Sequence, residues 1–234
     1  MCFDAGWHGQ AQRYTQMALR AAHSAEDRQV GANVLGFAAS QAACSGDGVA
    51  AEGLSRTALA GGRGALTPAV EGYVRLGLGR GRACLGDLSG AAASFDTAEA
   101  LLASSDPEGE PDWTYWFTVG ELHGIVGQTY LLAHEPETAV GHLHQAIEET
   151  GEEFARDRAA YLADMATAQV LNGDLDESRH NAERALEILS GDLNSGRVVE
   201  LLTNYCAALR AHNPRGAADF EERLAAYTRS PSQA

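Results

Sequence analysis

Residues 84–98, CLGDLSGAAASFDTA, join the end of one predicted helix to the start of the next. The Gly-Asp pair suits such a break, because glycine readily ends a helix and an aspartate side chain caps the following one. After the break, Ala91 and Ala98 are seven residues apart, so they lie on one face of the second helix. Small residues at this spacing allow two antiparallel helices to approach closely. The stretch therefore predicts a helix-turn-helix unit.

The same pattern recurs at three other places, with breaks at 44–48, 132–136 and 171–175. Aligned on the break, the small-residue pattern of the second helices starts at Ala51, Ala91, Ala139 and Ser178, which are 40, 48 and 39 residues apart. A unit repeated in this way is typical of the tetratricopeptide repeat, whose shortest form has ~34 residues. The acidic, proline-containing stretch 106–112 is a clear internal loop and accounts for the longest interval.

We expect an all-α fold of about eleven helices, arranged as one right-handed superhelical solenoid without an independent second domain. The sequence has no strand pattern of useful length. The predicted units are half a repeat at 8–24 and helix pairs at 27–62, 67–104, 113–150, 154–190 and 195–228.

The composition excludes several classes of protein. The chain has 234 residues and a net charge of -15, with 45% hydrophobic and 21% charged residues, which is ordinary for a globular protein and excludes disorder. Its acidic charge opposes contact with a phosphate backbone, so we expect no direct nucleic-acid binding by this chain. No apolar run approaches the roughly 20 residues that span a bilayer, and the first residues do not resemble a secretory signal. We expect a cytoplasmic protein that does not contact membranes.

The cysteines are far apart in the sequence and form no CxxC motif. They are Cys2, Cys44, Cys84 and Cys206. In a chain expected to be cytoplasmic, such cysteines are more often small buried hydrophobes than metal ligands or disulfide partners. Cys44 and Cys84 hold the same repeat position, two residues before the turn, where the other repeats have Leu132 and Leu171. This correspondence predicts an apolar packing site at that position.

The sequence contains no recognisable catalytic motif, so we expect no enzyme activity, no cofactor and no metal site. His142 and His144 are the closest histidine pair, but side chains two residues apart on a helix point in different directions and chelate one metal poorly. The glycine-rich run 77–81 lies inside a predicted helix, which argues against a phosphate-binding loop. Acidic clusters such as those at 148–153 are interpreted as solvated helix faces.

The first helices of such repeats line a concave groove, where we predict that a partner binds. The groove positions follow from counting back from each turn, and the helix after the acidic loop adds two aromatic residues. The predicted groove residues are Asn33, Ser40, Tyr73, Arg80, Trp113, Phe117, Glu121, Gln128, Asp164, Thr167 and Tyr205. We expect Trp113 and Phe117 to lie within two turns before Glu121 on one long helix. Alternatively, the aromatic residues of this segment belong to the core, with Trp116 the best core candidate.

The predicted groove suits an extended peptide or a helix, because aromatic rings provide contact area and amides pair with backbone groups. Recognition of a C-terminal carboxylate needs several convergent basic residues. The groove offers only Arg80 and Asn33 for that purpose. An uncharged or basic peptide therefore fits better as the partner.

Several stretches of the chain carry a resemblance in their order and spacing. They are AQRY at 11–14 with QMAL at 16–19, GANVL at 31–35, PDWTYW at 111–116 with EL at 121–122, and FEERL at 220–224. Together they resemble the C-terminal repeat region of actinobacterial Xre-type (Cro/cI-like) transcriptional regulators. In that family a helix-turn-helix DNA-binding domain precedes the repeats, whereas this sequence starts within the repeat pattern. The resemblance therefore implies a sensor or protein-interaction region, and DNA binding is not transferred to these residues.

The sequence predicts a non-enzymatic module that binds a peptide or protein in transcriptional or signalling regulation. Two alternatives stay open. The chain can be the ligand-sensing portion of a DNA-binding Xre-type regulator, which the sequence upstream of Met1 would decide. It can also be a structural module, because its first helix lacks a repeat partner and exposes an apolar face that a second copy could cover in a homodimer.

Overall fold

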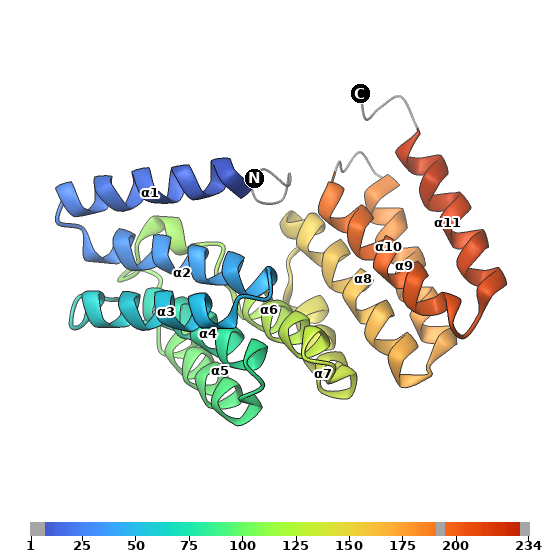
Figure 1. Ribbon diagram of the computed structural model, residues 1–234, viewed down its shortest axis with the longest axis horizontal. Coiled ribbons are helices and arrows are strands. Elements are labelled where there is room, and N and C mark those ends of the chain that lie inside the picture. Colours follow the sequence, from blue (N-terminus) through green and yellow to red (C-terminus); the bar gives the residue numbers. More distant parts are fainter. Residues whose placement is uncertain (1–7, 191–194, 230–234) are drawn as a thin grey trace. The chain divides into compact units, whose positions relative to one another are not determined.

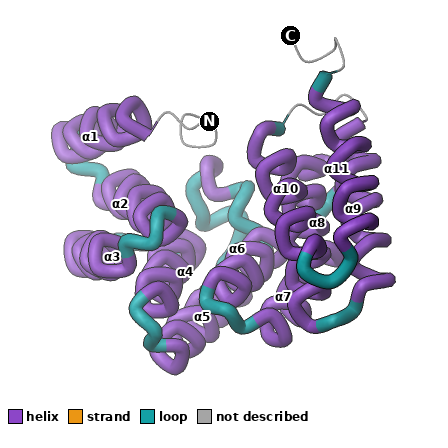
Figure 2. Tube along the Cα trace, turned by 45° about the vertical axis from the view of Figure 1, so that its right-hand side comes forward, coloured by secondary structure: helices purple, strands orange, loops and turns teal. Residues whose placement is uncertain are grey.

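The computed structural model describes residues 8–190 and 195–229, whose regular secondary structure is entirely helical (Figures 1 and 2). Within these ranges lie two short 3-10 helices, η1 (Asp112–Thr114) and η2 (Glu152–Phe154), and eleven α-helices. The α-helices are α1 (His8–Ser24), α2 (Arg28–Cys44), α3 (Gly48–Gly62), α4 (Pro68–Cys84), α5 (Leu88–Ala103), α6 (Val119–Leu132), α7 (Pro136–Glu149), α8 (Ala155–Asn172), α9 (Leu175–Ser190), α10 (Gly196–Arg210) and α11 (Pro214–Thr228). The prediction of an all-α fold is confirmed. Among the described helices, none combines the length and apolar character needed to cross a membrane.

The chain divides into two compact units, Met1–Leu122 and His123–Ala234, with the boundary inside α6. The first unit contains α1 to α5 and the start of α6, and the second contains the rest of α6 and α7 to α11. The prediction that all the repeats belong to one domain concerns the chain as a whole and stays a prediction.

Short Gly-Asp turns separate the two helices of a pair. Gly46 and Gly86 have φ angles of 76° and 82°, in the left-handed region that glycine adopts without strain. In each turn the following aspartate, Asp47 or Asp87, accepts a hydrogen bond of 2.9 Å from the main-chain N–H three residues later. These bonds satisfy donors at the starts of α3 and α5. The sequence interpretation of these two turns is confirmed.

Small residues lie where the helices of the first unit cross. α2 packs against α3 and α4, and α4 packs against α3 and α5. Ala51 of α3 and Ala91 of α5 are completely buried at these crossings. Gly81 of α4 lies so close to α3 that a Cβ atom there would come within 2.6 Å of the main-chain nitrogen of Glu52. The absence of side-chain bulk therefore sets the distance between α3 and α4.

The second unit is built around α8, which packs against α7, α9 and α10, while α10 also packs against α11. Two glycines of α6 again mark close approaches. A Cβ atom at Gly124 would lie 2.2 Å from the ring of Tyr161, and one at Gly127 would lie 2.6 Å from Cγ of Leu143. Because Tyr161 belongs to α8 and Leu143 to α7, these glycines allow both helices to pack against α6.

The structure corrects the packing expected at the shared cysteine position. Its four residues, Cys44, Cys84, Leu132 and Leu171, are exposed. Each lies at or next to the last residue of its helix, where the chain turns away. The position therefore marks a helix end and is not an apolar packing site. Cys206 is buried as expected, and Cys2 lies outside the described residues.

The segment before α6 also differs from the prediction. α6 begins at Val119 and Trp113 lies in η1, so no long helix carries Trp113 and Phe117 to Glu121. The hydroxyl oxygen of Thr118 accepts a hydrogen bond of 3.2 Å from the Glu121 main-chain N–H and so caps the start of α6. The rings before this cap pack against α2 and α4, and these tertiary contacts outweigh the modest helix propensity of the segment.

Alanine substitutions at two glycines should distinguish the effect of close packing on the free energy of unfolding from the effect of helix propensity. Gly81→Ala places a methyl group against the backbone of α3, so we expect the free energy of unfolding to fall by about 2 kcal/mol. Gly53→Ala, in α3, is the matched control. No atom lies within 4 Å of its Cβ position, so better helix propensity should raise the free energy of unfolding by about 0.5–1 kcal/mol. Urea unfolding followed by circular dichroism measures both, and equal stability of the two variants would contradict the close approach.

Candidate partner-binding surface

Four rings gather in the first unit, and we call them the aromatic surface. They are Phe37 of α2, Tyr73 of α4, and Trp116 and Phe117 before α6. The ring centroid of Tyr73 lies 5.1 Å from that of Phe37, 5.0 Å from Trp116 and 5.5 Å from Phe117. Tyr73 and Phe117 are buried, Trp116 is partly exposed and Phe37 is 41% exposed. The two buried rings hold the two accessible rings in place, so the exposed half forms an ordered contact surface.

Three polar residues predicted for the groove surround the phenol of Tyr73. Burial raises the pKa of Tyr73 well above its ordinary value; the neighbouring Ser40 hydroxyl and the positive charge of Arg80 oppose this rise, and the charge of Glu121 adds to it. Tyr73 therefore stays protonated at neutral pH. The structure thus brings Ser40, Tyr73, Arg80 and Glu121 close together. Tyr73 and Arg80 are buried, and the predicted part of these four residues in binding a partner stays a prediction.

Arg80 carries a charge that is almost fully enclosed by protein. The residue is 5% exposed, and its Nη2 atom donates a hydrogen bond of 2.9 Å to Sγ of Cys44. The ion pairs found among the described residues do not include Arg80. A guanidinium has five N–H donors, so a thiol leaves much of its hydrogen-bonding capacity unused. This buried cation lies close to Tyr73 of the aromatic surface, because its charge acts on the Tyr73 phenol.

Two other predicted residues of this unit have different surroundings. Asn33 is half-buried and lies one turn before Phe37, so the two side chains share a face of α2. Trp113 lies apart from the aromatic surface and packs against the core formed by α2, α3 and α4. The prediction that Trp113 faces the groove is therefore corrected, and the alternative interpretation as a residue packed on the core holds for it.

A polar chain links three helices of the second unit. Nε2 of Gln128, on α6, donates a hydrogen bond of 2.8 Å to Oδ2 of Asp164, on α8. At the start of α10, Nη2 of Arg197 donates one of 3.3 Å to Oε1 of Gln128. Asp164 is 6% exposed, and burial raises its pKa to about 6, against the opposing effects of the Gln128 hydrogen bond and the Arg197 charge. Gln128 and Asp164 were predicted to share one face, and the structure brings them into contact.

The remaining two predicted groove residues have structural roles. The hydroxyl of Thr167 donates a hydrogen bond of 3.1 Å to the carbonyl of Ala163 in its own helix, so its donor is already satisfied. Tyr205 is completely buried, and its ring packs edge-on against Phe220 of α11 with centroids 5.2 Å apart. Tyr205 therefore belongs to the core of the second unit, which corrects its assignment to the groove.

The sequence register missed two residues that the structure places with the predicted ones. Phe37 lies four residues after Asn33 and three before Ser40, so helical spacing could have identified it. Arg197 lies eight residues before Tyr205 on α10, and counting back from the turn selected only Tyr205 on that helix. Trp116, the expected core residue, is partly exposed, and its neighbour Phe117 is the buried one.

The histidines contact different neighbours. Nδ1 of His142 lies 3.0 Å from Nδ1 of His123, and the two rings stack. His144 instead lies 3.4 Å from the carboxylate of Glu148 on the same helix. Within the described ranges, no three metal-binding side chains come together.

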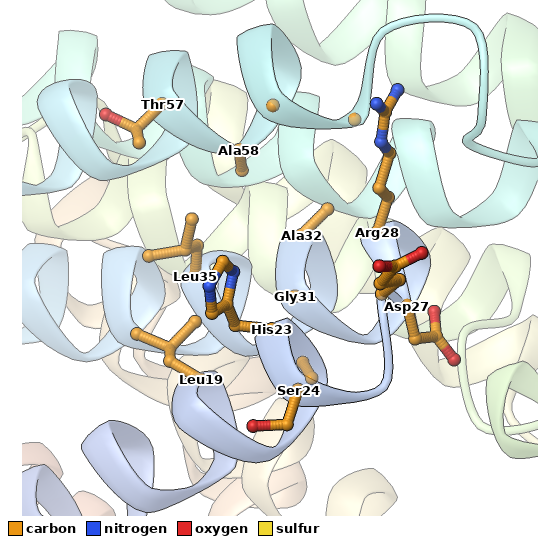
Figure 3. A pocket seen from close by; sticks show the side chains of 14 residues that line it. Leu19, His23, Ser24, Asp27, Arg28, Gly31, Ala32, Leu35, Thr57 and Ala58 are labelled. Atoms are coloured by element: carbon orange, nitrogen blue, oxygen red, sulfur yellow. The ribbon is translucent and has the colours of Figure 1, made fainter.

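A separate hollow of about 580 Å³ lies between α1, α2 and α3 (Figure 3). Its apolar lining includes Leu19, Leu35 and Ala58, and its size is within the usual range of small-molecule pockets. At its edge, the carboxylate of Asp27 accepts a hydrogen bond of 3.0 Å from the main-chain N–H of Val30 and so caps α2. None of the predicted groove residues lines this hollow, so we take the aromatic surface as the candidate site.

Comparisons with known proteins bear on the fold. No protein-family model matches the chain, and no curated protein sequence gives a significant match. The chain is similar to the crystal structure of BtubC (BKLC) from P. vanneervenii, with 19% identity, a TM-score of 0.61, and coverage of 95% of this chain and 91% of that chain. It is also similar to a Podosopora anserina protein described as a kinesin light chain with nearly identical TPR-like repeats, with 18% identity, a TM-score of 0.58, and coverage of 84% and 96%.

The fold is that of TPR-like repeats. At these identities the likeness concerns the fold alone. TPR-like repeats generally serve as protein-interaction scaffolds, and the helices that carry Phe37 and Tyr73, and those that carry Gln128 and Asp164, are first helices of such pairs.

The raised pKa of Asp164 predicts a pH dependence of stability. Its pKa is about 6 in the folded protein and ~3.9 in an unfolded chain, so the folded state holds the proton more tightly. Stability from this group is therefore present below about pH 4 and is lost as pH rises through about 6, by roughly 3 kcal/mol. Asp164→Asn lacks this effect. Its free energy of unfolding, relative to the original chain, should rise by that amount between pH 4 and 7.

Urea unfolding at several pH values measures this difference. Asp96→Asn, at an exposed position of α5, is the control and should give a constant difference across the same range, because its carboxylate is hydrated in both states. A constant difference for Asp164→Asn as well would contradict the assigned burial of its charge.

Proposed function

We propose that this chain is a non-catalytic TPR-like module that binds a peptide or protein segment on the aromatic surface. The observation that supports this most directly is the exposure of Phe37 and Trp116 above buried Tyr73 and Phe117. Large aromatic rings that are partly exposed but fixed in position are the usual anchors of protein interfaces. The TPR-like fold supports the same assignment.

The chemistry of the surface favours a partner segment with an apolar side chain. Phe37 and Trp116 provide area for that side chain, and the amide of half-buried Asn33 provides a group that pairs with a peptide backbone. The chain has 32 acidic and 17 basic residues. This charge attracts basic segments over a distance and repels acidic ones, so we propose an uncharged or basic partner.

The biological setting rests on the sequence resemblance to Xre-type regulators. On that basis we propose a role in transcriptional or signalling regulation in the cytoplasm. In this role, binding of the partner triggers the regulatory response. The alternative, a ligand-sensing portion of a DNA-binding regulator, uses the same surface. The net charge of -15 gives no support for DNA contact by this chain.

Substitutions on the aromatic surface should remove partner binding without unfolding the chain. We expect Phe37→Ala and Trp116→Ala each to lower the recovery of the bound protein at least tenfold, because loss of an anchor ring typically costs more than about 1.4 kcal/mol. The measurement is capture from a lysate of the source organism on the immobilised chain, with quantitative mass spectrometry. Tyr115→Ala is the matched control, since this neighbouring ring is 75% exposed and contacts no other ring among the described residues.

The control should recover the partner at the original level. Equal recovery by all variants would contradict binding at the aromatic surface, while loss only in variants with altered circular dichroism would indicate unfolding instead. Each variant is therefore compared by its thermal unfolding curve as well.

Self-association is a second candidate function, favoured by the surface of α1. Tyr14 and Met17 are exposed, although both are large and they lie on neighbouring turns of one helix face. If a second copy covers this face, light scattering should give about twice the chain mass of 24.7 kDa, and Tyr14→Ser with Met17→Ser should return it to the single mass. A single mass for the original chain at micromolar concentration would contradict this role.

A further inference from the structure

Two exposed thiols lie at the ends of neighbouring helices. Cys44 is the last residue of α2 and Cys84 the last residue of α4, and the two helices pack against each other. Sγ of Cys84 donates a hydrogen bond of 3.5 Å to the carbonyl oxygen of Ala43. A carbonyl oxygen lies about 2.8 Å from the Cα atom of the next residue in a trans peptide. The Cys84 sulfur is therefore at most about 6.3 Å from the Cys44 Cα atom. A bond between the two sulfurs requires side-chain rotation and a shift of the helix ends from this arrangement.

A buried cation contacts one of these thiols. Arg80 is enclosed by protein on all but a small part of its surface, and its guanidinium donates a hydrogen bond to Sγ of Cys44 at 2.9 Å. Cys44 is nevertheless an exposed residue. A guanidinium in this position stabilises the negative charge of a sulfur that acts as a nucleophile. Arg80 also lies one helical turn before Cys84 on α4, and its charge acts on the Cys84 thiol too, where it opposes the rise in pKa caused by burial.

The three described cysteines differ in burial and in their contact with Arg80, and this difference indicates which thiol reacts first. Partial burial raises the pKa of the Cys84 thiol, and the positive charge of Arg80 opposes this rise. Cys206 is completely buried, and burial raises its pKa to about 11. Among the three described cysteines, Cys44 is therefore the accessible one that has a cation at its sulfur, and Cys206 serves as an internal reference.

We propose that Cys44 and Cys84 form a reversible disulfide in the presence of a peroxide, with Cys44 reacting first and Arg80 as its positioning residue. This proposal is independent of the proposed function, because the bond can be mapped without a partner protein.

The chemistry balances with hydrogen peroxide as the oxidant. The Cys44 thiolate attacks one peroxide oxygen; an S–O bond forms, the O–O bond breaks, and the leaving hydroxide takes up a proton to give water. The Cys84 thiolate, formed by loss of its proton, then attacks the sulfur of the Cys44 sulfenic acid. An S–S bond forms, the S–O bond breaks and a second water leaves. In sum, two thiols are oxidised to one disulfide and one peroxide is reduced to two waters.

Peptide mapping tests the proposal directly. The chain is treated with hydrogen peroxide, alkylated without reduction and cleaved after arginine, which places the four cysteines in four different peptides because all 17 basic residues are arginine. We expect a peptide pair linking Cys44 to Cys84, its disappearance after dithiothreitol, and an unmodified Cys206. A disulfide between other cysteines or between two chains, or oxidation without a disulfide, would overturn the proposal.

Two variants separate the roles of the residues. Cys84→Ser should leave a sulfenic acid on Cys44 that dimedone traps, and absence of the trapped product would overturn the assigned order. Arg80→Gln should slow disulfide formation at least tenfold, whereas Arg75→Gln removes a more exposed guanidinium from the same helix and should leave the rate unchanged. Equal rates for both arginine variants would overturn the role of Arg80. Thermal unfolding verifies that each variant is folded, and the dimedone result tests the reaction order independently of Arg80→Gln.

Discussion

The closeness of neighbouring helices is the constraint on which the rest of this structure depends. Ala51 and Ala91 are completely buried where the helices of the first unit cross, and at Gly81 a Cβ atom would meet the backbone of α3. In the second unit, Cβ atoms at Gly124 and Gly127 would meet the side chains of Tyr161 and Leu143. Close approach keeps packing dense with few large side chains, since only 7% of the residues are aromatic. The helix crossings are therefore formed by small residues, and four of the aromatic residues form the aromatic surface.

Dense packing also encloses polar groups that would otherwise face water. Tyr73, Arg80 and Asp164 each lie on the first helix of a pair and are nearly completely buried. Burial raises the pKa of Tyr73 and Asp164, and it leaves the guanidinium of Arg80 with a thiol as hydrogen-bond acceptor. Isolated charges are costly in such surroundings. The proposed thiol chemistry of Cys44 depends on one of these enclosed groups, the guanidinium of Arg80.

Much of the architecture could be predicted from residue spacing. The Gly-Asp pairs at 46–47 and 86–87 locate two turns, because a left-handed glycine followed by a capping aspartate is a local arrangement that needs no tertiary contact. The groove positions were predicted less well. Gln128 and Asp164, both predicted to line the groove, contact each other, whereas Tyr205 is in the core. A register places a residue on a helix face and does not say which neighbour covers that face. Cys44 and Cys84 were predicted to be buried for the same reason.

The sequence by itself determined the all-α fold, the turns and the small residues at the helix crossings, since all of these follow from helical periodicity and from the conformations of single residues. Only the tertiary structure decided the path of residues 112–118, where contacts with α2 and α4 outweigh helix propensity and leave Phe37 and Trp116 at the surface. It also decided the contact between Arg80 and Cys44. Their positions are 36 residues apart in the sequence, and only the packing of α2 against α4 brings a buried cation to an exposed thiol.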